Sequence, residues 1–291
     1  MWIRYEWMHD NRIFNLADER AYKWLRDTLI RMIRDNGIDI YRQDFNLDPL
    51  PFWRAADAEG RRGYTENRYV TNLYRLLDAL LAEFPGLLID NCAGGGNRLD
   101  FEMNTRSVPM WRSDTGCHPA AEGSPTLLWN QNQTLGLTRY LPYHATATWT
   151  TDTNAFRSAE TMGLACNLDV LNDAFDSDCA KYPLEEMNAL RSFWDGDFYP
   201  LTQASCEDNV WAAYQLDRDG SGFCMFFRRK NAPESCTFTL GAIDPAAQYA
   251  VALTDNDYRR TELSLPGREL ARFAAEIGEP DESLVLEYRR L

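Results

Sequence analysis

Two aspartates stand at positions where a pair of carboxylates can carry out acid and base chemistry. Asp44 follows the apolar run 38–41, and Asp114 follows the run 108–111, about 70 residues later. In parallel α/β proteins, functional side chains gather where strands end and loops begin. Glycoside hydrolysis needs two such carboxylates, since one attacks the sugar or activates water and the other protonates the leaving oxygen. The spacing therefore suggests a glycosidase site, although either Asp alone is also a common turn or cap residue.

A run of three glycines, Gly94 to Gly96, lies between the two aspartates in the sequence. It matches neither the GxxxxGK[ST] loop nor the GxGxxG fingerprint of nucleotide-binding proteins. Consecutive glycines favour close approach of the backbone to a ligand. We therefore interpret the run as part of a ligand-binding loop and predict no nucleotide cofactor.

Other catalytic classes lack their usual signals. The histidines, His9, His118 and His144, do not have HExxH spacing, and the seven cysteines contain no CxxC pair, so we predict no metal site. No GxSxG elbow offers a serine nucleophile. The odd number of cysteines, without regular spacing, favours a reducing compartment.

Charge and composition exclude several partners. The chain has 291 residues, with 30 Lys plus Arg against 44 Asp plus Glu and a net charge of −14. Nucleic acids and anionic membrane surfaces need a basic footprint, so neither is an expected partner. No stretch approaches the roughly 20 apolar residues of a membrane span, and the first residues lack the apolar core of a signal peptide. We therefore expect a cytoplasmic protein. Its nine tryptophans are compatible with core packing or with stacking on sugar rings.

Helix and strand patterns alternate over the first two thirds of the chain. Residues 21–33 and 70–84 carry apolar side chains at three- and four-residue spacing, and each pattern ends at a glycine-containing stop. Strands are expected at 12–16, 38–41, 87–90, 108–111, 140–147 and 162–169, and a helix at 184–194. This alternation predicts an α/β fold with a parallel sheet: a (β/α) barrel, or, as the structural alternative, a doubly wound sheet.

The pattern changes near residue 199. Short β-type runs, separated by turn residues, follow at 211–216, 222–227, 236–240, 249–253, 261–265 and 284–288. They predict a small antiparallel β-sandwich. We place the domain boundary near residue 198, with a catalytic barrel domain over 1–198 and a C-terminal β-sandwich domain over 199–291.

Three segments, in this order, resemble glycoside hydrolase family 36, the bacterial α-galactosidase family: YRQDFN (41–46), NCAGGGNRLD (91–100) and MWRSDTG (110–116). FNLADERAYKWL (14–25) is similar to the family's stretch before the nucleophile strand, and residues 199–291 are similar to its C-terminal β-domain. The resemblance implies a partial TIM (β/α)8 barrel and a retaining α-galactosidase without a cofactor, acting on an α-galactoside oligosaccharide.

Residue roles follow from the resemblance position by position. It implies that Asp44 is the catalytic nucleophile and Asp114 the general acid/base of a double displacement. It implies sugar contacts from Arg42, Asn46, Cys92, Gly94, Gly95, Arg98 and Trp111. Arg42 stands where the family has Lys, Gln43 replaces an aromatic residue, and a second Asp shortly after Asp114 is missing. These departures leave an α-N-acetylgalactosaminidase or a galactosyl-transferring enzyme open.

The resemblance also places the start of the chain late in the barrel. Only a short stretch precedes residues 14–25, whereas the family has a large N-terminal β-domain and two barrel strands there. We therefore expect barrel strands three to eight in a chain shortened at its N-terminus. A barrel without two strands exposes sheet edges, which natural proteins avoid. This leaves open a non-catalytic carbohydrate-binding protein, a homo-oligomer, or a truncated barrel that depends on a complementing N-terminal chain.

Overall fold

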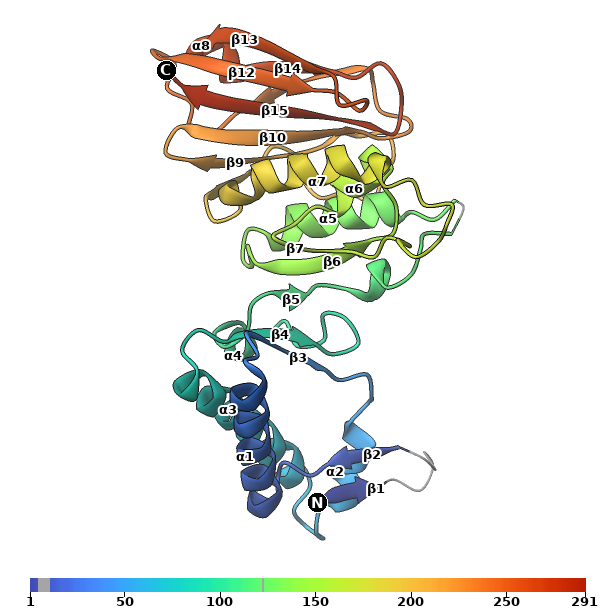
Figure 1. Ribbon diagram of the computed structural model, residues 1–291, viewed down its shortest axis with the longest axis vertical. Helices are drawn as coiled ribbons and strands as arrows, with labels where there is room; N and C mark the ends of the chain where they lie inside the picture. Colours follow the sequence, from blue (N-terminus) through green and yellow to red (C-terminus); the bar gives the residue numbers. More distant parts are fainter. Residues whose placement is uncertain (5–10, 122) are drawn as a thin grey trace. The chain divides into compact units, whose positions relative to one another are not determined.

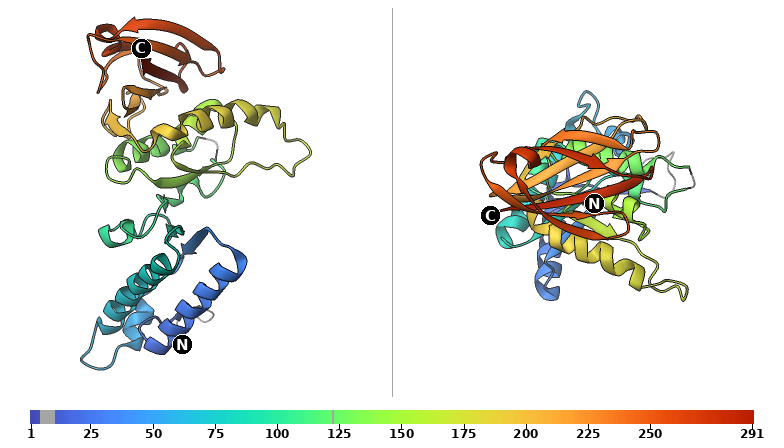
Figure 2. Two further views of the ribbon diagram at one scale, coloured as in Figure 1. Left: turned by 60° about the vertical axis from the view of Figure 1, so that its left-hand side comes forward. Right: turned by 90° about the horizontal axis from the view of Figure 1, so that it is seen from above.

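The computed structural model describes residues 1–4, 11–121 and 123–291. The chain divides into two compact units, Met1–Trp111 and Arg112–Leu291. Figure 1 and Figure 2 show the elements of each unit coloured along the sequence. The division falls between Trp111 and Arg112, so the domain limits 1–198 and 199–291 stay a prediction.

The first unit is built around three parallel strands. Its described elements are β1 (Trp2–Arg4), β2 (Arg12–Phe14), α1 (Glu19–Asn36), β3 (Ile40–Asp44), α2 (Leu50–Ala56), α3 (Tyr64–Glu83), β4 (Leu88–Cys92), α4 (Phe101–Asn104) and β5 (Met110–Trp111). β4 pairs in parallel with β3 and with β5. The strand expected at 12–16 is confirmed as β2, but it pairs antiparallel with β1 and lies outside the parallel sheet.

The helix signals in the sequence are confirmed. The Asp18 side chain caps α1 by accepting the Arg20 N–H, and α1 ends at Gly37, whose φ of 61° is left-handed. Glycine adopts this backbone without steric cost. α1 and α3 lie side by side (Figure 1). Their apolar faces share one buried cluster with the sheet, which includes Ile33, Leu77 and Ile89.

The pleat of the sheet separates a helix-facing side from a polar side. Successive residues of a strand point to opposite faces. Tyr41, Ile89 and Met110 join the cluster under the helices. The opposite face therefore carries the alternate positions of β3 and β4, which pair in register as Arg42 with Asp90 and Asp44 with Cys92. This face presents most of the residues that the sequence assigned to a sugar site.

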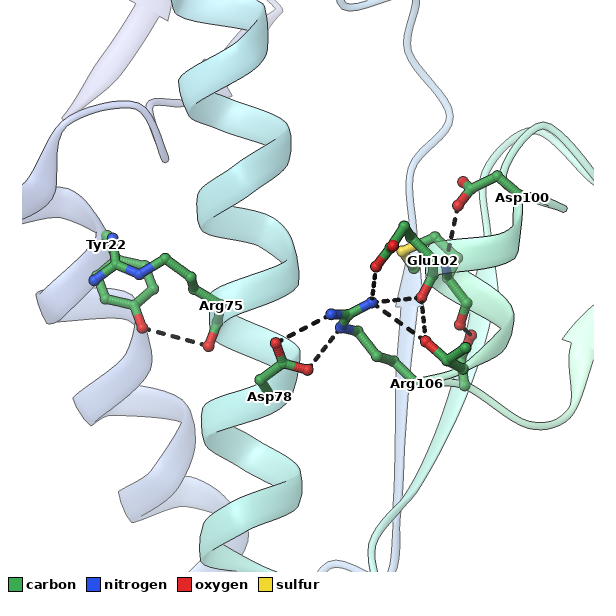
Figure 3. Close-up of polar contacts among 9 residues, drawn as sticks. Tyr22, Arg75, Asp78, Asp100, Glu102 and Arg106 are labelled. Atoms are coloured by element: carbon green, nitrogen blue, oxygen red, sulfur yellow. Dashed lines mark hydrogen bonds and ion pairs between the residues drawn. The ribbon is translucent and has the colours of Figure 1, made fainter.

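Polar contacts fix α4 against α3 (Figure 3). Arg106 Nε and Nη2 donate to the two Asp78 oxygens at 2.6 and 3.2 Å, and its Nη1 donates to the Glu102 carboxylate at 2.6 Å. On the side of α3 that faces α1, the Tyr22 hydroxyl donates to the Arg75 carbonyl at 3.4 Å. The Arg106 contacts hold the segment that leads into β5, whereas the Tyr22 bond joins α1 to α3.

The second unit begins with a short helical and parallel part. Its described elements there are η1 (Asp114–Gly116), α5 (Thr126–Leu137), β6 (His144–Thr148), α6 (Thr153–Ala159), β7 (Gly163–Cys166), α7 (Asp178–Leu190) and η2 (Arg191–Phe193). β6 and β7 pair in parallel with α6 between them in the chain, as a crossover connection requires. The helix expected at 184–194 begins earlier, at Asp178, and contains Pro183, a residue that normally marks a helix start.

An antiparallel part completes the second unit. Its strands are β8 (Asp197–Pro200), β9 (Ala212–Arg218), β10 (Ser221–Arg228), β11 (Ser235–Thr239), β12 (Gln248–Thr254), β13 (Arg260–Pro266), β14 (Arg272–Glu276) and β15 (Glu282–Arg290), with α8 (Gly267–Leu270) before β14. One six-stranded sheet has the order β13-β12-β15-β10-β9-β8, and β11 pairs with β14. All six expected β-type runs are confirmed, whereas the sequence missed β8 and β14.

Both faces of the six-stranded sheet are buried. On one face Phe226 and Leu286 pack with Phe238 of β11. On the other face Tyr214 and Phe223 pack with Trp194 and with residues of α5 and α7. None of the helices within residues 1–4, 11–121 and 123–291 is long and apolar enough to cross a membrane.

A buried ion pair joins α6, α7 and β15. The Arg157 side chain is fully buried, and its Nε and Nη2 donate to the two Glu186 oxygens at 2.7 Å each. Its Nη1 donates to the Ser283 carbonyl at 3.1 Å. Because removal of one partner leaves the other charge uncompensated in the interior, this contact is costly to break.

We expect Arg157→Met to lower the free energy of unfolding by about 3–5 kcal/mol, measured by urea unfolding. The control is Arg218→Met, which removes an exposed ion pair with Asp195 and should cost less than about 1 kcal/mol. Equal costs for the two variants would contradict the role given to Arg157.

Candidate active site

Asp44 ends β3 on the polar face of the first unit. Its side chain is 36% exposed, and its Oδ2 lies 3.6 Å from Arg42 Nη2. Arg42 is held mainly by Asp90, because its Nη1 donates to both Asp90 oxygens at 2.8 Å. The Asp44 carboxylate thus lies beside a fixed cation and remains accessible to an approaching molecule.

Arg42 is clamped from two sides. Its guanidinium carbon lies 5.3 Å from the centre of the Trp111 ring, which adds a cation–π contact to the Asp90 pair. Burial opposes the charge, but the hydrogen bond and the charge of Asp90 raise the pKa of Arg42 above its usual value. The planar fork of Arg42 therefore stays charged and directed beside Asp44.

Cys92 lies at the end of β4, opposite Asp44 in the register. It is 2% exposed. Burial, with a further contribution from the neighbouring Asp44 carboxylate, raises the pKa of the Cys92 thiol to about 11. At neutral pH the group is therefore an uncharged thiol, which can donate a hydrogen bond.

The glycine run forms a tight loop after β4. Gly94 and Gly95 have left-handed φ values of 50° and 75°, which favour glycine. The Gly94 N–H donates to Asn46 Oδ1 at 3.1 Å, so the segment after β3 is tied to the loop after β4. Among the residues named for sugar contacts, the first unit thus brings together Arg42, Asn46, Cys92, Gly94, Gly95 and Trp111 around Asp44.

Arg98 makes contacts different from those of Arg42. Its guanidinium lies 4.9 Å from the centre of the Phe45 ring, and its Nη1 donates to Asn91 Oδ1 at 3.4 Å. Burial lowers the pKa of Arg98. Asn91 is buried at 1% exposure, so these contacts tie the loop to the sheet, and a sugar contact from Arg98 stays a prediction.

Asp114 lies in the second unit, where it begins η1 and is exposed. The Cys117 thiol donates to Asp114 Oδ1 at 3.2 Å, and the Cys117 N–H donates to the Asp114 carbonyl at 3.1 Å. Ser113 caps the turn by accepting the Thr115 N–H at 3.1 Å. These local bonds present the Asp114 carboxylate on a closed turn.

A buried arginine anchors the chain just before that turn. The Arg112 N–H donates to the Ala145 carbonyl at 2.9 Å, its Nη1 donates to Thr134 Oγ1 at 2.8 Å, and its Nη2 donates to Asn130 Oδ1 at 2.9 Å. Burial among these neutral partners lowers the pKa of Arg112 to about 9. Arg112 therefore links the backbone before Asp114 to β6 and α5.

The two described histidines lie in different surroundings. His144 is fully buried, its Nε2 lies 3.0 Å from Thr138 Oγ1, and burial lowers its pKa well below the usual value. His118 is exposed, and His9 lies outside the described residues. Within residues 1–4, 11–121 and 123–291, no group of three or more His, Cys, Asp or Glu side chains could hold a metal ion.

Sequence reasoning missed two polar residues that support the site. Asp90 could have been found from strand alternation, because it precedes Cys92 by two positions and must share its face. Arg112 carried no signal, since a charged residue at a strand end is normally exposed. Its burial depends on α5 and β6, which come later in the chain.

Known sequences that are similar to this chain are α-galactosidases. Residues 6–120 match the Melibiase family model. Alpha-galactosidase 1 of Pediococcus pentosaceus is 30% identical over 102 residues, which cover 35% of this chain and 14% of that protein. Alpha-galactosidase Mel36A of Lactobacillus acidophilus is 22% identical over 268 residues, which cover 84% of this chain and 35% of that protein. The chain thus spans about a third or less of the length of these relatives.

Solved structures share the fold. The GH36 alpha-galactosidase AgaA of Geobacillus stearothermophilus, in a variant complexed with raffinose, has a TM-score of 0.77 at 18% identity, covering 96% of this chain and 39% of that one. A further variant, complexed with stachyose, has a TM-score of 0.73. The likeness confirms a partial (β/α)8 barrel followed by an antiparallel β-domain, rather than the doubly wound alternative. The family model, the relatives and the solved structures together show that the chain is similar to GH36 α-galactosidases.

The high pKa of Cys92 predicts slow alkylation. Since only the thiolate reacts, iodoacetamide should leave Cys92 largely unlabelled at pH 8, and its labelling rate should rise until the pH reaches about 11. Peptide mass mapping measures the labelling, with the exposed Cys206 as control. Equal labelling of Cys92 and Cys206 at pH 8 would show that the thiol is neither buried nor neutral.

Proposed function

We propose that this chain carries the nucleophile and the acid/base of a retaining glycoside hydrolase that acts on α-galactosides. The observation that supports this most is the accessible Asp44 carboxylate between the fixed Arg42 guanidinium and the neutral Cys92 thiol. A carboxylate can attack an anomeric carbon, while adjacent fixed donors hold sugar hydroxyls and restrict the geometry of attack.

The reaction would proceed in two displacements. Asp44 attacks the anomeric carbon and forms a glycosyl ester, while Asp114 gives its proton to the leaving oxygen. Asp114 then takes a proton from water, the water oxygen attacks the anomeric carbon, and the ester bond to Asp44 breaks. In retaining enzymes the two carboxyl groups are about 5–5.5 Å apart, which is the separation that the proposal requires of Asp44 and Asp114.

An oligosaccharide is the proposed substrate. Complexes of structural relatives with raffinose and stachyose support an α-galactoside of this kind. The rigid fork of Arg42 presents two N–H groups where a Lys would present a mobile ammonium. We expect it to favour a sugar with adjacent hydroxyls over one with a bulky acetamido group.

Carbohydrate binding without turnover is the second candidate. It is favoured by Ile40 and Leu88, which pair in register and are 58% and 45% exposed on the same face of the sheet as Asp44. An apolar pair of this kind normally packs against a further segment. If such a segment also supplies residues needed for turnover, the chain by itself would bind a sugar without hydrolysing it. Galactoside binding without hydrolysis, measured by calorimetry, would support this candidate over the first.

We expect Asp44→Asn to lower kcat for an aryl α-galactoside by about 10³-fold or more, because the amide cannot form the glycosyl ester. The matched control is Asp39→Asn, which changes an exposed Asp just before β3 and should leave kcat unchanged. An unaltered kcat in Asp44→Asn would remove Asp44 from the nucleophile role.

Asp114→Ala should behave as the loss of an acid/base. The decrease in kcat/KM, which reports the first displacement, should be about 10²–10⁴-fold with an alkyl leaving group and much smaller with a dinitrophenyl group, which needs no proton. Azide should restore turnover by attacking the glycosyl ester. Equal losses for both leaving groups, without azide rescue, would contradict the role of Asp114.

A further inference from the structure

The middle of α5 is polar around its whole circumference. Residues 130–134 have the sequence NQNQT, and three of them, Asn130, Gln131 and Thr134, are buried. Successive residues of a helix are rotated by about 100°, so five in a row point in all directions. A helix packed into a domain normally turns an apolar face to the core. The mechanism proposed above uses none of these five side chains.

One side of α5 holds the turn that carries Asp114. The Arg112 side chain, two residues before the aspartate, donates two hydrogen bonds to α5, at 2.8 and 2.9 Å. On the other side of the aspartate in the sequence, Thr115 Oγ1 accepts a hydrogen bond from Gln133 Nε2 at 3.4 Å. α5 thus contacts the chain both just before and just after Asp114.

A second buried arginine holds the opposite side of α5. Arg229 directly follows β10 and is 2% exposed. Its Nε donates to Gln131 Oε1 at 2.9 Å, and its Nη2 donates to Asn132 Oδ1 at 3.1 Å. Its Nη1 donates to the carbonyls of Ser205 and Glu207 at 2.6 and 2.8 Å. Arg229 therefore ties α5 to β10 and to the segment between β8 and β9.

These bonds favour one geometry of α5 rather than greater stability. The hydrogen-bond acceptors of Arg229 are uncharged oxygens, and burial lowers the pKa of Arg229. Burial of a cation among neutral groups costs free energy, which an apolar helix face would avoid. Hydrogen bonds have preferred distances and directions, so bonds on two opposite sides restrain both the rotation and the shift of the helix. Asp114 lies between two residues that this helix holds.

We propose that α5 is a brace for the proton donor: Gln133 is a positioning residue that holds the Asp114 turn, and Arg229 anchors the opposite side of the helix. The inference rests on the proposed function, which assigns the proton transfer to Asp114. A proton donor must lie within hydrogen-bond reach of the oxygen that it protonates. Loosening of the brace should therefore slow the step that needs this proton and spare a reaction that does not.

Hydrogen exchange of the full chain, measured by mass spectrometry, tests the brace without relying on activity. Two backbone N–H groups within residues 113–118 are hydrogen-bonded inside the turn, so their exchange reports its order. Gln133→Leu and Arg229→Met should each raise the exchange rate of this segment about fivefold or more, because a restraining hydrogen bond is lost. Exchange in β13 and β15 should not change. The matched control is Gln248→Leu, since Gln248 is exposed on β12; it should exchange as the unmodified chain does.

Kinetics tests whether the brace serves proton donation. In Gln133→Leu, kcat/KM should fall about tenfold with an alkyl α-galactoside and stay within about twofold of the unmodified chain with a dinitrophenyl galactoside, whose leaving group needs no proton. A merely structural role would lower both values equally. Thr115→Val removes the hydroxyl that Gln133 contacts. It should reproduce the decrease, and the double variant should be no slower than Thr115→Val alone, because the two side chains act through one contact.

Folding of each variant is verified by circular dichroism, and Arg229→Lys replaces Arg229→Met if the latter does not fold. Unchanged exchange of residues 113–118 in Gln133→Leu, or an equal increase in β13 and β15, would overturn the inference. Equal losses of kcat/KM for the two leaving groups would overturn it as well. Raised exchange confined to residues 113–118, combined with no hydrolysis by the unmodified chain, would support the brace and reject only the proposed function.

Discussion

The parallel register of β3 and β4 is the constraint on which the site of the first unit depends. It sets Arg42 opposite Asp90 and Asp44 opposite Cys92 on one face, while Tyr41 and Ile89 anchor the other face under α1 and α3. A shift of one residue would exchange the two faces and place the carboxylates among leucines. The apolar cluster under the helices therefore determines where the polar chemistry lies.

Buried arginines organise the second unit in a comparable way. Arg112 and Arg157 are both buried, yet their environments differ. Arg157 is neutralised by Glu186, whereas Arg112 contacts neutral side chains: Thr134, Asn130 and His144. Placing a cation among neutral groups costs free energy. The rest of the unit must supply that free energy, and the result is that the backbone just before Asp114 is tied to α5 and β6.

Much of the fold was predictable because its signals are local. The caps and apolar spacing of α1 and the turn residues between the C-terminal strands each depend on a few neighbouring residues. β14 was missed because its alternation is interrupted by charged ends, and β8 because it has only four residues and ends in a proline. The partners of β2 could not be predicted, since strand pairing depends on residues distant in the sequence.

The candidate site was predictable in part. Motif resemblance named Asp44, Arg42 and Cys92, and the structure brings these three together. It could not supply Asp90 or Arg112, because their roles arise from strand register and from contacts between helices and strands. Arg98 contacts Phe45 and Asn91 in the structure, and its sugar contact stays a prediction.

The neutral thiol of Cys92 has a further consequence for the reactivity of its neighbour. An ammonium at that place would offer a hydrogen bond and a full positive charge together, and the charge would draw electron density away from the attacking oxygen. A sulfhydryl offers the hydrogen bond alone. The thiol therefore adds no positive charge beside the Asp44 carboxylate, and the cations that act on this carboxylate are Arg42, with its Nη2 3.6 Å from Oδ2, and Arg98.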